Sequence, residues 1–252
     1  MSDITAGLNV FSEIHSDIPR EGPGNNESTR KALSFLSRLP KNAAILDIGC
    51  GPGMQTIELA KTCDARITAL DTKQTYLDEV DRRAVDGGFS EQITTIRASM
   101  RDLPFDLASF DAIWAEGAIY IIGFEEGLGY WKSFLKPGGY VAVTEICWLK
   151  NGVPEEPLSF WAEAYPDMTT IDRRLETIRN CGYTNVAHFT IPESGWWDDF
   201  YGPLENRIDL LKAKYADTTD AMNALADAQR EIDIYRKYSE FYGYVFFIME
   251  LR

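Results

Sequence analysis

Short apolar strands alternate with helical stretches from residue 41 onward, and this alternation restricts the fold more than any other feature of the sequence. The first five apolar strands are expected at residues 45–48, 67–70, 93–98, 110–115 and 140–146. Segments of helical periodicity or turn residues separate them. Five such strands predict a parallel sheet whose connections are right-handed crossovers.

The same alternation continues to the C-terminus. We expect a helix at 170–181, a sixth strand at 186–191, a mostly helical insertion at 196–243 and a seventh strand from Tyr244 to Leu251. Because the seventh strand returns to the sheet, a single domain over 1–252 is predicted rather than two domains. Its parts are an N-terminal arm and helix (1–40), a core (41–195), the insertion (196–243) and the last strand (244–252).

Composition excludes several classes of function. The net charge of −14 argues against a nucleic-acid partner and against an anionic membrane surface, because both attract basic proteins. Four scattered cysteines without a C-x-x-C pair, and only two histidines, predict no metal site and indicate a reducing compartment. The chain shows neither a signal peptide nor an apolar run of ~18 residues, so a cytoplasmic protein is expected.

A glycine-rich loop, Asp47-Ile48-Gly49-Cys50-Gly51-Pro52-Gly53, joins the first strand to a helix. Its glycines permit a sharp turn and close approach of a ligand to the helix N-terminus. Asp71 follows 18 residues after Gly53, at the end of the second strand, where a carboxylate can bind both hydroxyls of a ribose. The spacing is G-x-G-x-G rather than G-x-G-x-x-G, and Asp47 would oppose a pyrophosphate. The loop therefore favours S-adenosylmethionine, which carries an ammonium and a sulfonium, over a nicotinamide dinucleotide of an oxidoreductase.

Further motifs follow the loop in a fixed order. They are Leu103-Pro104-Phe105 before Phe110-Asp111, and Leu135-Lys136-Pro137-Gly138-Gly139. Together with residues 45–53 and Asp71, they resemble the class I S-adenosylmethionine-dependent methyltransferases of small-molecule type. The resemblance implies a Rossmann-like, seven-stranded, mostly parallel sheet with an antiparallel C-terminal strand and helices on both faces. It also implies S-adenosylmethionine as cofactor and S-adenosylhomocysteine as product.

The resemblance assigns cofactor contacts to individual residues. The glycines of the loop would line the methionine moiety, Asp71 would bind the ribose, and Thr72 would lie beside the adenine. Ser99 and Met100 stand where the family often has Asp-Ala, so the usual charged contact to the adenine is replaced here. The expected cofactor-binding residues are Asp47, Gly49, Cys50, Gly51, Gly53, Gln55, Asp71, Thr72, Ser99, Met100, Arg101 and Glu116.

Catalytic residues are expected where the fourth strand ends, because this end faces the transferable methyl group in the fold. The sequence there is Glu116-Gly117-Ala118-Ile119-Tyr120, without the [DNS]-P-P-[YF] motif of DNA amino-methyltransferases. Glu116 has three alternative functional interpretations: it holds the cofactor's amino group, it contacts a cationic substrate, or it acts as a base. The structural alternative is a solvated carboxylate in a loop. Tyr120 and His15, from the arm, complete the catalytic set. Other aromatic side chains that could cover the site are Trp131, Trp148, Trp196, Trp197 and Tyr201.

These features predict methyl transfer to a small-molecule acceptor, with an amine nitrogen as the first hypothesis and a hydroxyl as the second. The alternative is a non-catalytic subunit that binds S-adenosylmethionine as a partner or sensor. The 196–243 helices offer a surface for a homodimer. The arm around Glu21-Gly22-Pro23-Gly24 is interpreted either as a lid over the cofactor or as an ordinary ordered terminus.

Overall fold

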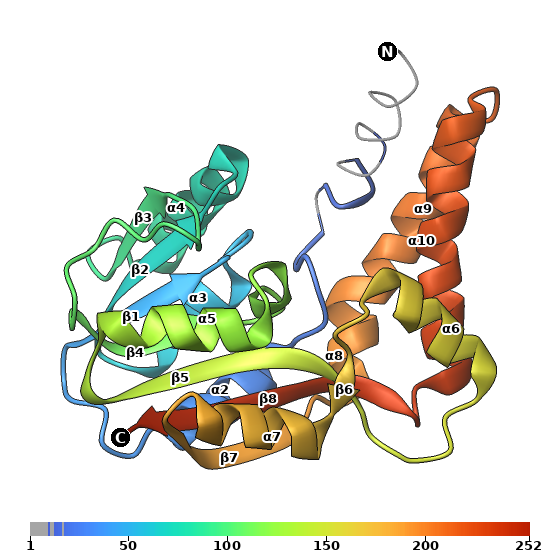
Figure 1. Cartoon of the computed structure of the whole chain (residues 1–252). Coiled ribbons are helices and arrows are strands. Elements are labelled where there is room, and N and C mark those ends of the chain that lie inside the picture. The colour runs from blue at the N-terminus through green and yellow to red at the C-terminus, as the bar shows by residue number, and fades with distance from the viewer. Residues whose placement is uncertain (1–9, 11–12, 17) are drawn as a thin grey trace.

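A central sheet organises the computed structural model, which describes residue 10 and residues 13–16 and 18–252 (Figure 1). Its strand order is β3-β2-β1-β4-β5-β8-β7, with β6 paired to β5 outside this path. The strands are β1 (Ala43–Ile48), β2 (Ala65–Asp71), β3 (Ile93–Arg97), β4 (Phe110–Ala115), β5 (Leu135–Trp148), β6 (Thr169–Thr170), β7 (Tyr183–Thr190) and β8 (Tyr242–Leu251). The seven predicted strands are all present, and the two-residue β6 is an addition.

β8 gives the sheet its mixed character, because it runs antiparallel to both of its neighbours, β5 and β7. All the other pairings are parallel. The predicted Rossmann-like sheet with an antiparallel C-terminal strand is therefore confirmed. β5 begins earlier than expected, at Leu135, because Leu135 already pairs with Phe110 of β4; the pairing is then irregular and resumes at Tyr140. Within this irregular stretch, Gly138 adopts the positive φ (73°) expected of the glycine after Pro137.

Helices cover both faces of the sheet. The helices are α2 (Asn26–Ser34), α3 (Met54–Thr62), α4 (Gln74–Gly87), α5 (Phe124–Trp131), α6 (Glu155–Ala164), α7 (Ile171–Asn180), α8 (Ser194–Trp196), α9 (Gly202–Lys214) and α10 (Thr219–Tyr238). Short turns η1 (Ile119–Ile121), η2 (Lys132–Phe134) and η3 (Trp197–Tyr201) connect some of them. Side chains of α5 and α7 join one core cluster, and those of α2, α3 and α4 join the cluster on the opposite face. Burying both faces explains why the inner strands read as continuous apolar runs.

The helical insertion has a hydrophobic core of its own. α9 and α10 stand beside the end of the sheet at which β5 finishes, with α6 against them (Figure 1). Their buried side chains pack with Trp196, Tyr201 and Tyr242, and with Val10, Ile14 and Ile18 from the N-terminal segment. α6 was not predicted. No helix among the described residues is long and apolar enough to span a membrane.

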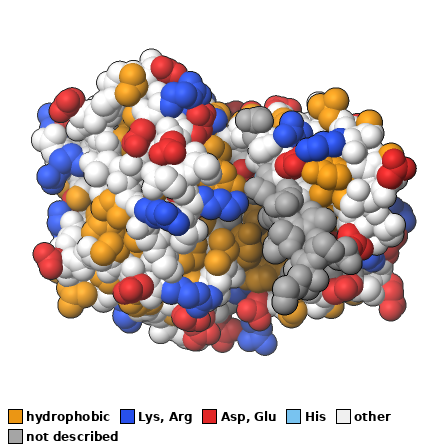
Figure 2. All heavy atoms as spheres, turned by 90° about the horizontal axis from the view of Figure 1, so that it is seen from above, with side chains coloured by type: hydrophobic (Ala, Val, Ile, Leu, Met, Phe, Trp, Pro, Cys, Tyr) orange, Lys and Arg blue, Asp and Glu red, His pale blue; other side chains and the backbone are white. Residues whose placement is uncertain are grey.

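The N-terminal segment connects the insertion to the sheet. On α9, Arg207 donates from Nε to the Glu13 carbonyl (2.9 Å) and from Nη2 to the Ser16 hydroxyl (2.6 Å). Residues 18–25, which we call the strap, then cross to the glycine loop, and the Gly24 N–H donates to the Gly195 carbonyl (2.8 Å). From above, hydrophobic side chains gather in a hollow between the two parts of the molecule (Figure 2).

Candidate active site

The glycine loop turns sharply between β1 and α3. Gly49, Gly51 and Gly53 have φ values of 68°, 52° and 85°, which L side chains rarely adopt. A Cβ on Gly49 would lie 2.6 Å from the Ala118 Cβ, so the loop also packs closely against the segment after β4. The loop thus presents bare backbone at the N-terminus of α3, as predicted for a ligand-binding turn.

Two acidic side chains brace this loop. Asp71, at the end of β2, accepts from the Gly51 N–H through Oδ2 (3.1 Å) and from the Lys73 N–H through Oδ1 (2.9 Å). Asp47 is fully buried and accepts from the Thr56 hydroxyl through Oδ2 (2.5 Å). Burial raises the pKa of Asp47 to about 7, and the neighbouring Glu116 raises it as well. Its Oδ1 has no hydrogen-bond partner among the described residues.

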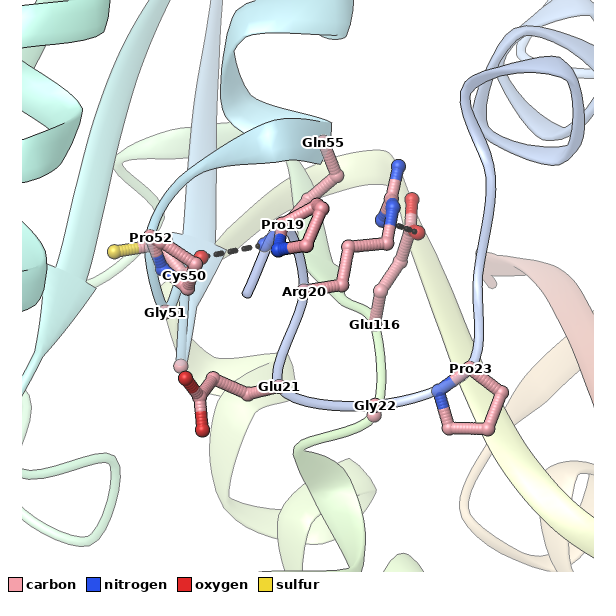
Figure 3. A pocket seen from close by; sticks show the side chains of 12 residues that line it. Pro19, Arg20, Glu21, Gly22, Pro23, Cys50, Gly51, Pro52, Gln55 and Glu116 are labelled. Carbon is pink, nitrogen blue, oxygen red and sulfur yellow. Dashed lines mark hydrogen bonds and ion pairs between the residues drawn. The ribbon is translucent and has the colours of Figure 1, made fainter. Parts of the chain in front are cut away.

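The strap lies over the loop and encloses a small cavity of about 50 Å³ (Figure 3). Pro19, Arg20, Glu21 and Pro23 line it from the strap side, facing Gly49, Cys50, Gly51, Pro52, Gln55, Glu116 and Gly117. Burial raises the pKa of Glu21, and the charge of Asp71 adds to this effect. Because Asp71 acts on Glu21, the strap brings a second carboxylate to the edge of the loop where a ribose is expected.

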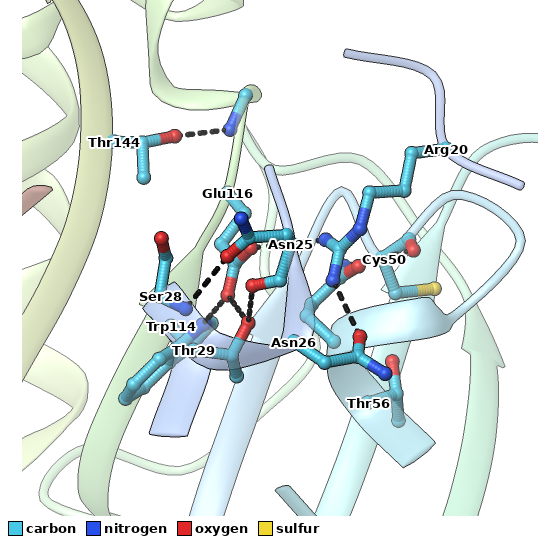
Figure 4. A network of polar contacts seen from close by, with 12 residues as sticks. Arg20, Asn25, Asn26, Ser28, Thr29, Cys50, Thr56, Trp114, Glu116 and Thr144 are labelled. Carbon is cyan, nitrogen blue, oxygen red and sulfur yellow. Dashed lines mark hydrogen bonds and ion pairs between the residues drawn. The ribbon is translucent and has the colours of Figure 1, made fainter. Parts of the chain in front are cut away.

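Glu116 is the centre of a buried polar network (Figure 4). Its side chain is 3% exposed and its Oε2 accepts from Arg20 Nη1 (3.1 Å). Its Oε1 accepts from the Thr29 hydroxyl (2.7 Å) and from Trp114 Nε1 (2.9 Å). Arg20 also donates to Asn26 (2.9 Å), whereas its buried Nε has no partner among the described residues. Both Glu116 oxygens are occupied, so this carboxylate positions the arginine.

The other predicted cofactor residues are divided between the cavity and its surroundings. Gln55 and Cys50 line the cavity, and Gln55 Nε2 donates to the Cys50 carbonyl (2.9 Å). Met100 is buried beneath the loop, with its Cε 3.5 Å from a Cβ built on Gly49. Thr72, Ser99 and Arg101 are exposed and do not line the cavity. Arg101 pairs with Glu126 (3.1 Å).

A second group of polar side chains lies where β5 ends. Glu145 is 1% exposed, and its Oε1 accepts from the Tyr165 hydroxyl (2.5 Å) and from Arg174 Nη2 (3.0 Å). Burial raises the pKa of Glu145 to about 7, although Arg174 and Tyr165 both favour its charged form. The Tyr165 ring contacts that of Tyr120 edge-on, with centroids 6.1 Å apart. Tyr120 thus lies between the cofactor loop and this buried cluster.

The insertion contributes a third carboxylate, Glu231 of α10. Its Oε1 accepts from the Tyr201 hydroxyl (2.8 Å). Burial raises the pKa of Glu231, whereas Tyr201 and the charge of His15 lower it. Burial also raises the pKa of Tyr120, and the charge of Glu231 is the next cause, ahead of Glu145 and Glu21. Glu231, which the sequence did not indicate, is therefore near enough for its charge to act on Tyr120 and for the charge of His15 to act on it.

The aromatic side chains that were considered as a cover for the site mostly belong to the core. Trp131 is fully buried and donates to the Met100 carbonyl (3.1 Å). Trp196 is 2% exposed and stacks on Tyr235 with ring centroids 4.0 Å apart. Arg20, Tyr165 and Glu231 were not singled out in the sequence as site residues. Arg20 lies in the arm, Tyr165 follows the unpredicted α6, and Glu231 lies in the insertion. Finding them would have required knowing how these three segments fold onto the sheet.

Comparison with known proteins decides the family. The profile of a family described as a methyltransferase domain matches residues 45–139. The chain is 30% identical over 209 residues to a demethylmenaquinone methyltransferase of Clavibacter sepedonicus, a match that covers 71% of this chain and 82% of that protein. The chain belongs to the class I S-adenosylmethionine-dependent methyltransferases.

Other relatives of this methyltransferase differ in their acceptors. It is 28% identical to the sterol 24-C-methyltransferase erg-4 of Neurospora crassa over 69% of the chain, which spans only 48% of that protein. Further relatives are named O-methyltransferases and a dimethylglycine N-methyltransferase. A methyltransferase of Geobacter sulfurreducens, solved with S-adenosylhomocysteine, has the same fold, with a TM-score of 0.82, 20% identity and 97% and 98% of the two chains covered.

The residues around the loop suit the cofactor of the family, S-adenosylmethionine. Arg20 lines the cavity, and its buried Nε, which has no partner among the described residues, is a donor that suits the carboxylate of a zwitterionic methionine group. Glycine is required at position 49, because the Cβ of any other residue would lie too close to Ala118. No group of three or more metal-ligating side chains occurs in the described part of the chain.

Proposed function

We propose that this enzyme transfers the methyl group of S-adenosylmethionine to a small-molecule acceptor, with an amine nitrogen as the first acceptor and a hydroxyl oxygen as the second. The observation that carries this proposal is that two carboxylates accept from phenols near Tyr120: Glu145 accepts from Tyr165 (2.5 Å), whose ring contacts Tyr120, and Glu231 accepts from Tyr201 (2.8 Å). Carboxylates next to aromatic rings favour a cationic ligand over an anionic one. A single methyltransferase domain over residues 1–252 is part of this proposal.

The cofactor is held by the loop and by the strap. Asp71 receives the ribose hydroxyls, the glycine loop lines the methionine part, and Arg20 donates to the methionine carboxylate. Glu116, bonded to Arg20, Thr29 and Trp114, fixes the direction of the guanidinium. When bound, the cofactor supplies a methyl group already activated by a positively charged sulfur.

The acceptor is placed between Tyr120 and the helical insertion. The chain's main contribution is to hold the nucleophile in line with the methyl group and to exclude water. Tyr120 forms one wall, because it follows directly on the Gly117 turn at the cavity. The Tyr165–Glu145 and Tyr201–Glu231 contacts then orient an ammonium or hydroxyl group.

The cofactor assignment is tested by calorimetry with S-adenosylhomocysteine. We expect Asp71→Ala to weaken binding by about 10- to 100-fold, the effect of losing hydrogen bonds to a charged group. The control is Asp78→Ala on α4, an exposed carboxylate bonded to Gln74, which should leave binding unchanged. Equal affinity of the Asp71 variant and the wild type would remove the basis of the proposed ribose site.

The acceptor assignment is tested with a panel of primary, secondary and tertiary amines and of phenols, monitored by release of S-adenosylhomocysteine. Turnover of amines, with weaker or no turnover of phenols, is expected. Turnover restricted to hydroxyl compounds would refute the amine hypothesis. Tight binding of the cofactor without turnover of any acceptor would instead favour the alternative, a binding or sensor subunit.

A further inference from the structure

The Glu21 side chain of the strap lies against the part of the glycine loop that is bonded to Asp71. A Cβ built on Gly51 would lie 3.5 Å from the Glu21 Cγ and 4.0 Å from the Glu21 Cβ, which is van der Waals contact. Glu21 and Gly51 both line the cavity, and the Glu21 side chain extends from the strap toward the loop (Figure 3). The Gly51 N–H donates to Asp71 Oδ2 (3.1 Å). One carboxylate from the strap and one from the end of β2 therefore meet at Gly51.

Two carboxylates that meet at one glycine repel each other unless hydrogen-bond donors lie between them. Asp71 Oδ1 and Oδ2 each accept one backbone N–H, from Lys73 and Gly51, and a carboxylate oxygen can accept about two. Burial raises the pKa of Glu21, a hydrogen bond with Tyr76 lowers it, and the charge of Asp71 raises it again. A ligand with two neighbouring hydroxyls can donate to both carboxylates, whereas an anionic group would add to the repulsion.

The strap is anchored on both sides of Glu21. On one side, Arg20 forms a buried ion pair with Glu116 at the end of β4 (3.1 Å). On the other side, the Gly24 N–H donates to the Gly195 carbonyl (2.8 Å). Glu21 therefore cannot leave the edge of the loop unless the strap itself moves, and a strap that closes again returns Glu21 to the same edge.

We propose that Glu21 is a second ribose-binding residue: when the strap closes over the bound cofactor, Glu21 and Asp71 share the two ribose hydroxyls, and each carboxylate accepts from one of them. This inference rests on the proposed function, which places the ribose at Asp71. Because Glu21 directly follows Arg20, closure brings the guanidinium to the methionine carboxylate and Glu21 to the ribose in one movement. Glu21 reaches the ribose only while Arg20 holds the strap down. The strap thus recognises the diol of the cofactor in addition to covering it.

The contact is tested by calorimetry with S-adenosylhomocysteine and with its 2′-deoxy and 3′-deoxy analogues. Glu21→Ala should weaken binding of S-adenosylhomocysteine by about 10-fold, the effect of losing one hydrogen bond to a charged group. This loss should disappear with the analogue that lacks the hydroxyl bonded to Glu21, and it should remain with the other analogue. Glu21→Gln should fall between Glu21→Ala and the wild type, because the amide keeps one acceptor oxygen.

The control is Glu27→Ala, which removes an exposed carboxylate in the first turn of α2 and should leave binding of all three compounds unchanged. Binding of S-adenosylhomocysteine by Glu21→Ala that equals or exceeds that of the wild type overturns the inference, since Glu21 then either does not contact the ribose or competes with it. An equal loss with both deoxy analogues also overturns it, because the damage is then to the strap and not to one contact. The proposed function fails separately, if the wild type does not bind S-adenosylhomocysteine or if Asp71→Ala binds it as tightly as the wild type.

Discussion

Asp47 connects the cofactor loop to the pH dependence of stability. Its carboxyl is buried completely, and burial raises its pKa to about 7, from a usual value of about 4. The folded protein therefore holds a proton on Asp47 at pH values where the unfolded chain has lost it. The contribution is fully present below pH ~4 and is lost as the pH rises through 7.

We accordingly expect the free energy of unfolding to fall by a few kcal/mol between pH 5 and pH 8. This magnitude follows because each unit by which the pKa is raised corresponds to about 1.4 kcal/mol. Asp47→Asn should reduce this slope, because the amide stays neutral and its carbonyl still accepts from Thr56. Urea denaturation at both pH values measures the effect, with Asp78→Asn as the exposed control. A slope identical to that of the wild type would show that Asp47 is ionised in the folded protein throughout this range.

At the level of residues, local sequence patterns predicted the groups whose place is set by the nearest strand. Gly49 and Gly51 follow the last residue of β1 by one and three positions, and Asp71 is the last residue of β2, so the strand ends alone bring them together. Arg20 reaches Glu116 across 96 residues of chain, and Tyr201 reaches Glu231 across 30. Such contacts depend on how the strap and the insertion pack. No local periodicity encodes this packing.

At the level of elements, the two glycines at the ends of α3 and α4 offer a matched comparison. Gly53 precedes α3 with φ 85°, and a Cβ there would lie 2.6 Å from Val80 Cγ2. Gly88 ends α4 with φ 76°, and nothing lies within 4 Å of its Cβ position. Gly53→Ala adds a clash between α3 and α4 to the backbone strain, whereas Gly88→Ala adds strain alone.

We expect Gly88→Ala to cost about 1 kcal/mol of the free energy of unfolding, the penalty of a left-handed conformation. Gly53→Ala should cost roughly 3 kcal/mol, because overpacking adds to the same penalty. It should also weaken binding of S-adenosylhomocysteine at least tenfold, since the loop must shift. Chemical denaturation and calorimetry measure the two effects. Equal losses of stability in the two variants would contradict the packing argument.

The boundaries of a helix or strand could be predicted from the sequence wherever its buried apolar residues recur at regular helical or strand spacing. The helix expected at 54–63 is α3 (Met54–Thr62), and the last strand begins two residues earlier than predicted, at Tyr242. α6 escaped prediction because it buries only Pro157 and Trp161, so its sequence carries almost no helical period. The insertion helices, with buried positions such as Leu225 and Ile232, do show the expected period.

At the level of the whole molecule, the strap joins two parts that would otherwise meet only along the sheet. The turn before it is bound to α9 through Glu13 and Ser16, and the strap itself is bound to the end of β4 through Arg20 and to α8 through Gly24. The cavity it leaves over the loop, about 50 Å³, is far below the ~300 Å³ or more of a cofactor-sized pocket. We therefore expect the strap to open when the cofactor enters, as the interpretation of the arm as a lid predicts.

If the strap closes again over the bound cofactor, Arg20 gains the methionine carboxylate as a partner and residues 18–25 become more ordered. We expect S-adenosylhomocysteine to slow hydrogen exchange of these residues at least about tenfold, together with that of the glycine loop. In Arg20→Gln the slowing should persist at residues 49–53 and disappear from the strap, because only the contact made by the guanidinium is lost. Mass spectrometry of deuterium uptake distinguishes the two segments. Unchanged exchange of the strap on binding would mean that the cofactor enters by another route. In that case Arg20 serves only the ion pair with Glu116, whose negative charge would otherwise be buried without a counterion.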